Sequence, residues 1–291
     1  MIYQILSNGL LLGGLFAVVA MGFSIVWGVM NLIILAHGAF IMLGAYITFW
    51  LFELWGIDPF LSIPISMVIL FVVGYLVQRH VINLVVKAQV FMTLILTFGL
   101  EILIMNLSTV AWTGNYRSVT TLYSGANIEI GPLIIPSVRL AIFLIALGIT
   151  AGLYFFISKT KTGNAIKATS LEKEAAQLVG IEIGRMYAIT FAIGGALAGA
   201  AGSLLAIISA ISPYMGGPYT LKAFVICVLG GLGSIIGLII GGITLGMAES
   251  VGTLLLGPGY ADAISFVILV VILAIRPEGL LGKKFFAEVK H

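Results

Sequence analysis

Residues 159–185 read KTKTGNAIKATSLEKEAAQLVGIEIGR, and long apolar runs flank this segment on both sides. The segment carries five basic and three acidic residues, whereas the flanking runs 140–158 and 186–210 carry no charge. An apolar helix of about 20 residues is long enough to span a bilayer. The contrast therefore places residues 159–185, hereafter the polar loop, outside a membrane and its two neighbours inside.

The composition of the whole chain points the same way. Of its 291 residues, 61% are apolar and only 9% are charged, whereas a soluble domain carries about 25% charged residues. The apolar runs are continuous, which argues against a transmembrane β-barrel, whose strands alternate between apolar and polar positions. The sequence predicts an all-α polytopic membrane protein that forms a single transmembrane domain over residues 1–291.

Apolar runs separated by turn or charged residues predict about eight or nine transmembrane helices. The run 222–256 is long for one span and tight for two, so two short helices and one span plus a re-entrant piece both stay open. The sequence shows no clear internal repeat. The other expected spans are a pair within 5–55 that breaks near Asn31, followed by 60–78, 90–111, 140–158, 186–210 and 263–275.

Basic residues predict the orientation, because cytoplasmic loops are enriched in Lys and Arg. They concentrate in three segments, 79–87, 159–185 and 276–290, so all three are expected in the cytoplasm. Counting spans backwards puts the N-terminus outside. The first basic residue of the chain is Arg79, so the first apolar stretch lacks the basic start of a signal peptide and is expected to be a retained span.

The sequence offers little for catalysis. It lacks the G-x-x-x-x-G-K-[ST] phosphate loop, and its acidic, His and Cys residues have no metal-ligand spacing. The single cysteine, Cys227, lies in an apolar run and is expected to be a packed thiol. We expect no enzymatic activity, no cofactor, no metal and no nucleic-acid partner.

Within the polar loop, the pattern predicts one short helix over 170–180. Ser170 is the expected N-cap, and Gly180 is expected to end the helix in a left-handed conformation. Such a helix of about ten residues is marginal alone in water and needs a surface to lie on, either the membrane or a groove on a cytoplasmic partner. Its apolar face is formed by Leu171, Ala175, Leu178 and Val179.

The pattern Glu174-Ala175-Ala176-x-x-x-Gly180 resembles the cytoplasmic EAA loop of ABC importer permeases, whose short helix docks on the ATPase subunit. The usual downstream Ile-x-Leu-Pro is absent, and residues 190–193 read TFAI instead, which argues against the maltose-type permease fold. By this resemblance, the ATPase-coupling residues are Ser170, Leu171, Glu174, Ala175, Ala176, Leu178 and Gly180.

Three other stretches occur in the order found in the branched-chain amino-acid permease family: NLIILAHGAFIMLGA at 31–45, GGLGSIIGLIIGG at 230–242 and RPEGLLG at 276–282. Together with the EAA-like loop, the chain resembles the smaller permease subunit of that family. The resemblance implies a subunit of an ATP-driven importer in a prokaryotic cytoplasmic membrane. It also implies a second permease subunit, two cytoplasmic ATPase subunits and an extracytoplasmic substrate-binding protein.

Several polar or glycine residues inside the spans are candidates for a substrate pathway, although each has a structural alternative. Intramembrane carboxylates are expensive and often functional, glycine ladders more simply reflect close helix packing, and a histidine beside a glycine is more simply a packing residue. The candidates are Asn31, His37, Glu101, Gly233, Gly237 and Glu249.

Two other functions stay open at this point. Within the same class, the substrate could be urea or a short amide. From a different class, an ion-coupled secondary transporter or channel would use Glu101 as its proton or ion site.

Overall fold

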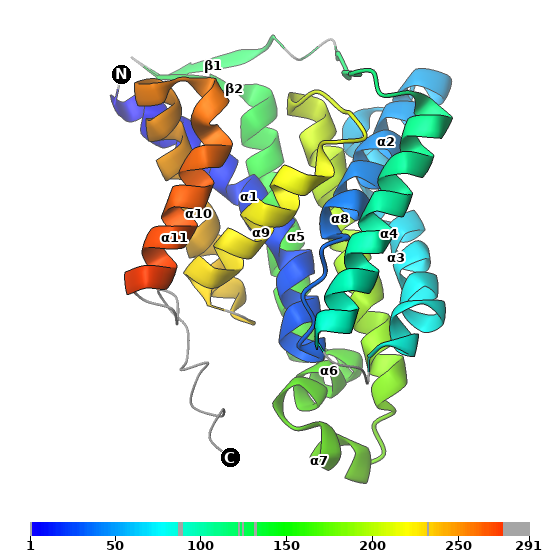
Figure 1. Cartoon of the computed structure of the whole chain (residues 1–291). Helices are drawn as coiled ribbons and strands as arrows, with labels where there is room; N and C mark the ends of the chain where they lie inside the picture. The colour runs from blue at the N-terminus through cyan, green and yellow to red at the C-terminus, as the bar shows by residue number, and fades with distance from the viewer. Residues whose placement is uncertain are drawn as a thin grey trace.

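The computed structural model describes residues 2–86, 90–121, 123, 125–130, 133–231 and 233–275. Within them the chain is almost entirely helical (Figure 1). The helices are α1 (Ile2–Met30), α2 (His37–Trp55), α3 (Pro59–His80), η1 (Ile82–Leu84), α4 (Val90–Trp112), α5 (Ser137–Lys159), α6 (Lys161–Leu171), α7 (Lys173–Leu178), α8 (Ile183–Ile208), α9 (Gly216–Gly230), α10 (Ile235–Leu256), η2 (Pro258–Tyr260) and α11 (Ala261–Ile275), and one hairpin pairs β1 (Asn127–Ile130) with β2 (Leu133–Pro136).

Seven of the described helices are long and apolar enough to cross a membrane: α1, α2, α3, α4, α5, α8 and α10. Two further apolar helices, α9 and α11, have 15 residues each, or about 22 Å at 1.5 Å per residue. That is shorter than the roughly 30 Å hydrocarbon core. The chain is thus a multi-pass membrane protein, as the composition predicts. Against the expected eight or nine spans, the described residues contain nine apolar helices, of which seven have spanning length.

The ambiguous run 222–256 contains a short helix and a full span. Helix α9 begins at Gly216, six residues before the expected start, and ends at Gly230, where Gly231 has a φ of 81°. Helix α10 then begins after Ser234, whose hydroxyl accepts a hydrogen bond from the Gly237 N–H over 3.1 Å. Figure 1 shows the segment before α9 descending into the bundle before the helix begins.

The four helices α1–α4 and the four helices α8–α11 are arranged as an inverted repeat. Helix α1 packs along α10, as α8 packs along α3; α4 contacts α2, as α11 contacts α9. In Figure 1, α1 and α8 run in opposite directions, and each is followed by a break and a helix that starts inside the bundle. Helix α5 stands between the two units and packs mainly on α1.

The two units meet where α2 and α9 begin. The Gly38 N–H donates to Thr220 Oγ1 over 2.8 Å, and that hydroxyl lies 3.2 Å from the Leu35 carbonyl oxygen. A Cβ on Gly38 would lie 2.0 Å from the Gly216 carbonyl oxygen, and a Cβ on Gly216 would lie 2.7 Å from that of Gly38. Only glycine permits this approach at both positions.

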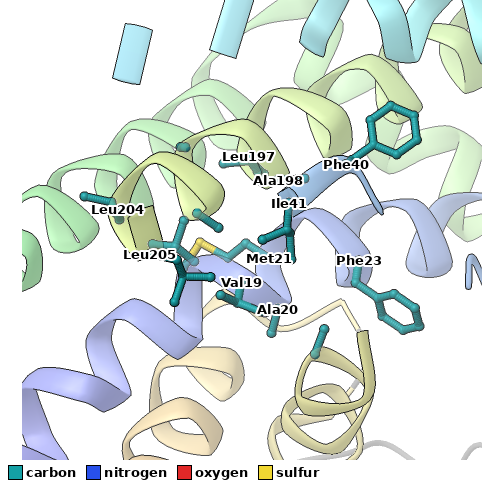
Figure 2. Close-up of a cluster of buried hydrophobic side chains, with 14 of the residues drawn as sticks. Val19, Ala20, Met21, Phe23, Phe40, Ile41, Leu197, Ala198, Leu204 and Leu205 are labelled. Carbon is teal, nitrogen blue, oxygen red and sulfur yellow. The ribbon is translucent and has the colours of Figure 1, made fainter. Parts of the chain in front are cut away.

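The core surrounds this crossing, and Figure 2 shows side chains of α1, α2 and α8 that build it. Buried apolar residues such as Met21, Ile41 and Leu204 are no more than 1% exposed. Helix α8 is the most enclosed of the candidate spans and α4 the least. Cys227 is fully buried, as the sequence predicts.

The two ends of the bundle differ. Arg79 and the α6–α7 segment lie at the same end, and the N-terminus lies at the other (Figure 1). Two of the three basic segments thus share one end, as the orientation argument requires, so we call this the cytoplasmic end. The third segment and the RPEGLLG stretch lie outside the described residues. The β1–β2 hairpin covers the opposite, outer end, where Gln4 Nε2 donates to the Ile134 carbonyl oxygen over 2.6 Å.

Candidate functional site

The polar loop folds as two helices, so the expected single helix over 170–180 is wrong. Helix α6 continues to Leu171, and α7 starts at Lys173 after Glu172 adopts an extended conformation, with φ −152° and ψ 108°. Ser170 is therefore not an N-cap. Its hydroxyl donates to the Lys167 carbonyl oxygen over 2.8 Å, a local bond that satisfies the end of α6.

Gly180 ends α7 as the sequence predicts. Its φ is 86°, a left-handed conformation that glycine adopts without a Cβ penalty. The Gly180 N–H donates to the Gln177 carbonyl oxygen over 2.9 Å, and the Ile181 N–H donates to that of Ala176 over 3.0 Å. These two bonds form a Schellman motif and fix the direction in which the chain leaves α7.

The apolar side chains of this segment face solvent. Leu171, Leu178 and Val179 are 84%, 88% and 76% exposed, whereas Ala176 is buried at 3%. The segment is held from α8, where the Lys173 ammonium lies 5.6 Å from the centre of the Tyr187 ring. Of the pattern residues, only Ala176 packs inward. An exposed apolar face on a rigidly capped turn is a surface suited to a protein partner.

A buried ion cluster lies at the outer end of α10. The Lys222 ammonium of α9 lies 3.0 Å from Glu249 Oε1 and 3.2 Å from Asp262 Oδ1. Ser265 Oγ donates to Glu249 Oε1 over 2.5 Å. Glu249 is 3% and Lys222 is 7% exposed. Buried charges are tolerated when they are paired and hydrogen-bonded, and here the pairing joins α9, α10 and α11.

Two cavities lie along the seam between α1, α5 and α10. The outer cavity has a volume of about 770 Å³ and is lined by residues that include Asn8, Arg139 and Glu249. The inner cavity, at the cytoplasmic end, is about 120 Å³ and is lined by residues that include Gly233 and Ser170. Two predicted pathway residues, Glu249 and Gly233, thus lie on one seam. Ser170, which the resemblance predicts as a coupling residue, borders the inner cavity.

The seam is closed between the two cavities. A Cβ on Gly14 of α1 would lie 2.3 Å from Phe143 Cδ2 of α5, so the Phe143 ring sits directly on the backbone of α1. Gly237 of α10 lies as close to the backbone of α9: a Cβ added to Gly237 would lie 1.9 Å from the Gly230 carbonyl oxygen.

The remaining predicted pathway residues lie elsewhere. His37 is buried, and its Nε2 donates to the Val19 carbonyl oxygen over 2.8 Å. Asn31 follows the last residue of α1 with a φ of 53°, which marks the expected break. Glu101 sits midway along α4, half-buried, and forms no hydrogen bond or ion pair with any described residue. It borders a small cavity beside the start of α9, together with Tyr214 and other residues.

One polar contact anchors the outer loop that precedes the hairpin. The Tyr123 hydroxyl donates to Asp58 Oδ2 over 2.8 Å. Burial, followed by the bond to Asp58 and its negative charge, raises the pKa of Tyr123 to about 12. The hydroxyl therefore keeps its proton, and with it the bond, throughout the physiological pH range.

The chain is similar to known proteins over almost its whole length. The family described as branched-chain amino acid transport system permease component matches residues 5–273. The chain belongs to this family. It is 32% identical to the high-affinity branched-chain amino acid transport system permease protein BraD of Pseudomonas aeruginosa, over 96% of this chain and 95% of that protein. It is 31% identical to LivH of Escherichia coli K12, over 96% and 95%. No solved structure matches the chain.

The permease contains charged residues at its outer end that sequence reasoning missed. Lys222 pairs with Glu249 and with Asp262, which lie 27 and 40 positions away from it, so no local pattern linked them. A lysine six residues into an apolar helix was the one available signal, because such a charge requires a partner.

Proposed function

We propose that this chain is the transmembrane permease subunit of an ATP-driven ABC importer for branched-chain amino acids. The exposed apolar side chains of Leu171, Leu178 and Val179 carry the proposal, because they project from the cytoplasmic end of a chain whose family consists of transport permease components. Curated relatives are named for branched-chain amino acid transport, so neither a urea permease nor an ion-coupled transporter is favoured.

The proposed assembly contains a second permease subunit, two cytoplasmic ATPase subunits and an extracytoplasmic binding protein, in a prokaryotic cytoplasmic membrane. Leu171, Leu178 and Val179 would occupy a groove on the ATPase. The Schellman turn at Gly180 would hold them at a fixed angle to α8. Movement of the ATPases would then reach α6, whose Ser170 borders the inner cavity on the α1–α5–α10 seam.

A co-purification experiment tests the docking surface. Leu178→Gln should lower the amount of ATPase subunit that co-purifies with the chain in mild detergent at least tenfold, with normal membrane insertion. Leu84→Gln is the matched control, because Leu84 is 81% exposed against 88% for Leu178 and ends η1, which directly follows the cytoplasmic end of α3. Equal ATPase recovery with both variants would overturn the docking proposal.

Glu101 supports a second permease subunit. An unpaired carboxylate midway along a membrane span is costly against lipid, yet α4 is the least enclosed candidate span. We propose that the partner permease covers this side of α4. A cysteine at position 101 should crosslink to the co-expressed partner, whereas one at Leu103, 55% exposed and on the opposite side of α4, should react with lipid-soluble maleimide instead. The reverse pattern would contradict the assignment.

A further inference from the structure

The outer cavity on the α1–α5–α10 seam carries chemistry that neither the fold nor the family assigns. It is enclosed by the first turns of α1 and α5, the end of α8 and the α10–α11 junction, all at the outer end of the bundle (Figure 1). Its volume of about 770 Å³ lies within the roughly 300–1,000 Å³ of small-molecule sites.

One wall of this cavity presents a free cation. Arg139, in the first turn of α5, lines the cavity and makes no hydrogen bond or ion pair with any described residue. A cation at a helix N-terminus is disfavoured by the helix dipole, so the guanidinium is not placed there to stabilise α5. Arginine binds carboxylates in a two-pronged geometry.

The facing elements present a negative centre. Glu249 lines the cavity and belongs to the cluster in which two carboxylates, Glu249 and Asp262, share the single ammonium of Lys222. Of these two carboxylates, only that of Glu249 is buried, because the Asp262 side chain is 55% exposed. A carboxylate has about four acceptor positions, and Lys222 and Ser265 provide the bonds to Glu249. Glu249 therefore retains capacity for one more donor.

The floor and side of the cavity are apolar. Leu12 of α1 and Leu254 of α10 line it, and the seam closes below them where Phe143 sits on Gly14. A guanidinium, a carboxylate with a remaining acceptor position and an aliphatic wall are the complements of a carboxylate, an ammonium and an aliphatic side chain, respectively. An α-amino acid with a branched apolar side chain combines all three.

We propose that the outer cavity is a binding site for a zwitterionic aliphatic amino acid, in which Arg139 binds the α-carboxylate and Glu249 accepts a hydrogen bond from the α-ammonium. The proposal rests on the transport function above and locates where the substrate enters this subunit. The site lies at the outer end of the bundle, on the outer side of the contact between Phe143 and Gly14, so it receives substrate before any opening toward the inner cavity.

Direct binding to the purified transporter, with its ATPases and partner permease but without binding protein, tests the site. Leucine should raise the thermal midpoint of the wild-type complex. Leucinamide, which lacks the carboxylate, and 4-methylpentanoate, which lacks the ammonium, should not. Arg139→Gln should weaken leucine binding at least tenfold, and Arg139→Lys should restore part of it. Arg139 is exposed, so neither variant threatens the fold.

Glu129→Gln is the matched control, because Glu129 is an exposed charge of β1 at the same end but does not line the cavity. No leucine shift in the wild type, equal shifts with all three ligands, or an unchanged affinity in Arg139→Gln would each overturn the site. ATP-driven leucine uptake by the wild-type transporter is measured in parallel. If uptake is absent, the transport function fails; if uptake occurs but Arg139→Gln leaves leucine binding intact, only the site fails.

Discussion

The crossing of α2 and α9 and the end of α7 both depend on glycine, but for opposite reasons. At the crossing, Gly38 and Gly216 have no room for a Cβ, because each faces the other's carbonyl oxygen. At the end of α7, a Cβ on Gly180 would meet nothing within 4 Å, and only the φ of 86° demands glycine. The two glycines at the crossing are required because a Cβ has no room there. Gly180 is required because its left-handed conformation sets the direction in which the chain leaves α7. Substitutions should therefore separate assembly of the fold from transmission of movement.

Gly38→Val should have the largest effect on stability. Its side chain would meet the Gly216 backbone, which cannot rotate away, and overpacking against rigid neighbours is destabilising. We expect folded protein to fall below detection in size-exclusion profiles from detergent. Gly148→Val, on α5 with nothing within 4 Å of its Cβ, should give a wild-type profile. Recovery of folded Gly38→Val would contradict the requirement for glycine where α2 and α9 meet.

Lys222→Met should come next, because it leaves Glu249 buried beside Asp262 without a counter-ion. Breaking a buried pair by removing one partner costs about 3–5 kcal/mol, measured as a lower thermal midpoint. Adding Glu249→Leu should recover part of the loss, since no buried charge then lacks a partner. A double variant less stable than the single variant would contradict this account.

Gly180→Val should affect stability less and transport more. A β-branched residue in the left-handed region costs about 1–3 kcal/mol, and the chain is expected to relax by changing its exit from α7. Membrane insertion should be normal, ATP hydrolysis should continue, and uptake should be lost. Gly184→Val, nearby at an ordinary φ and with open space around its Cβ, is the control and should transport normally.

Tyr123→Phe should have the smallest effect. It removes the hydrogen bond to Asp58, and a bond of this kind is worth about 1 kcal/mol. Because the pKa of Tyr123 is raised to about 12, above the ordinary value of about 10, the wild type keeps this advantage below pH 10 and loses it as the pH rises toward 12. The difference in thermal midpoint between wild type and variant should shrink over that range. Tyr116→Phe, on a side chain 79% exposed, should show no difference at any pH.

Hydropathy alone predicted most of the spans within a few residues, because an apolar run of bilayer length has few other uses. The break near Asn31 was also predictable locally, because a polar residue interrupts an apolar run that is long enough for two spans. The start of α9 at Gly216 was missed, since ISPYMGG at 211–217 has the composition of a surface loop, and composition does not reveal depth in the bundle.

Tertiary contacts explain the other misses. Ser170 has the chemistry of an N-cap, but its hydroxyl bonds backward to Lys167, because α6 is already held against α1, α5 and α8. The ion cluster joins residues from three helices, and the outer cavity joins residues from four helices and Ser209, which follows α8. No window along the sequence contains either group, so only the fold could bring them together.

The inverted arrangement of α1–α4 and α8–α11 has a consequence of parity. A unit that crosses the membrane four times returns to the side on which it began, so a second such unit is inverted only if an odd number of crossings separates them. Helix α5 supplies that one crossing. Losing it, or gaining another, would set both units in the same orientation and bring Arg185 to the outer face. Helix α5 belongs to neither unit, yet its single crossing is what inverts the second unit relative to the first.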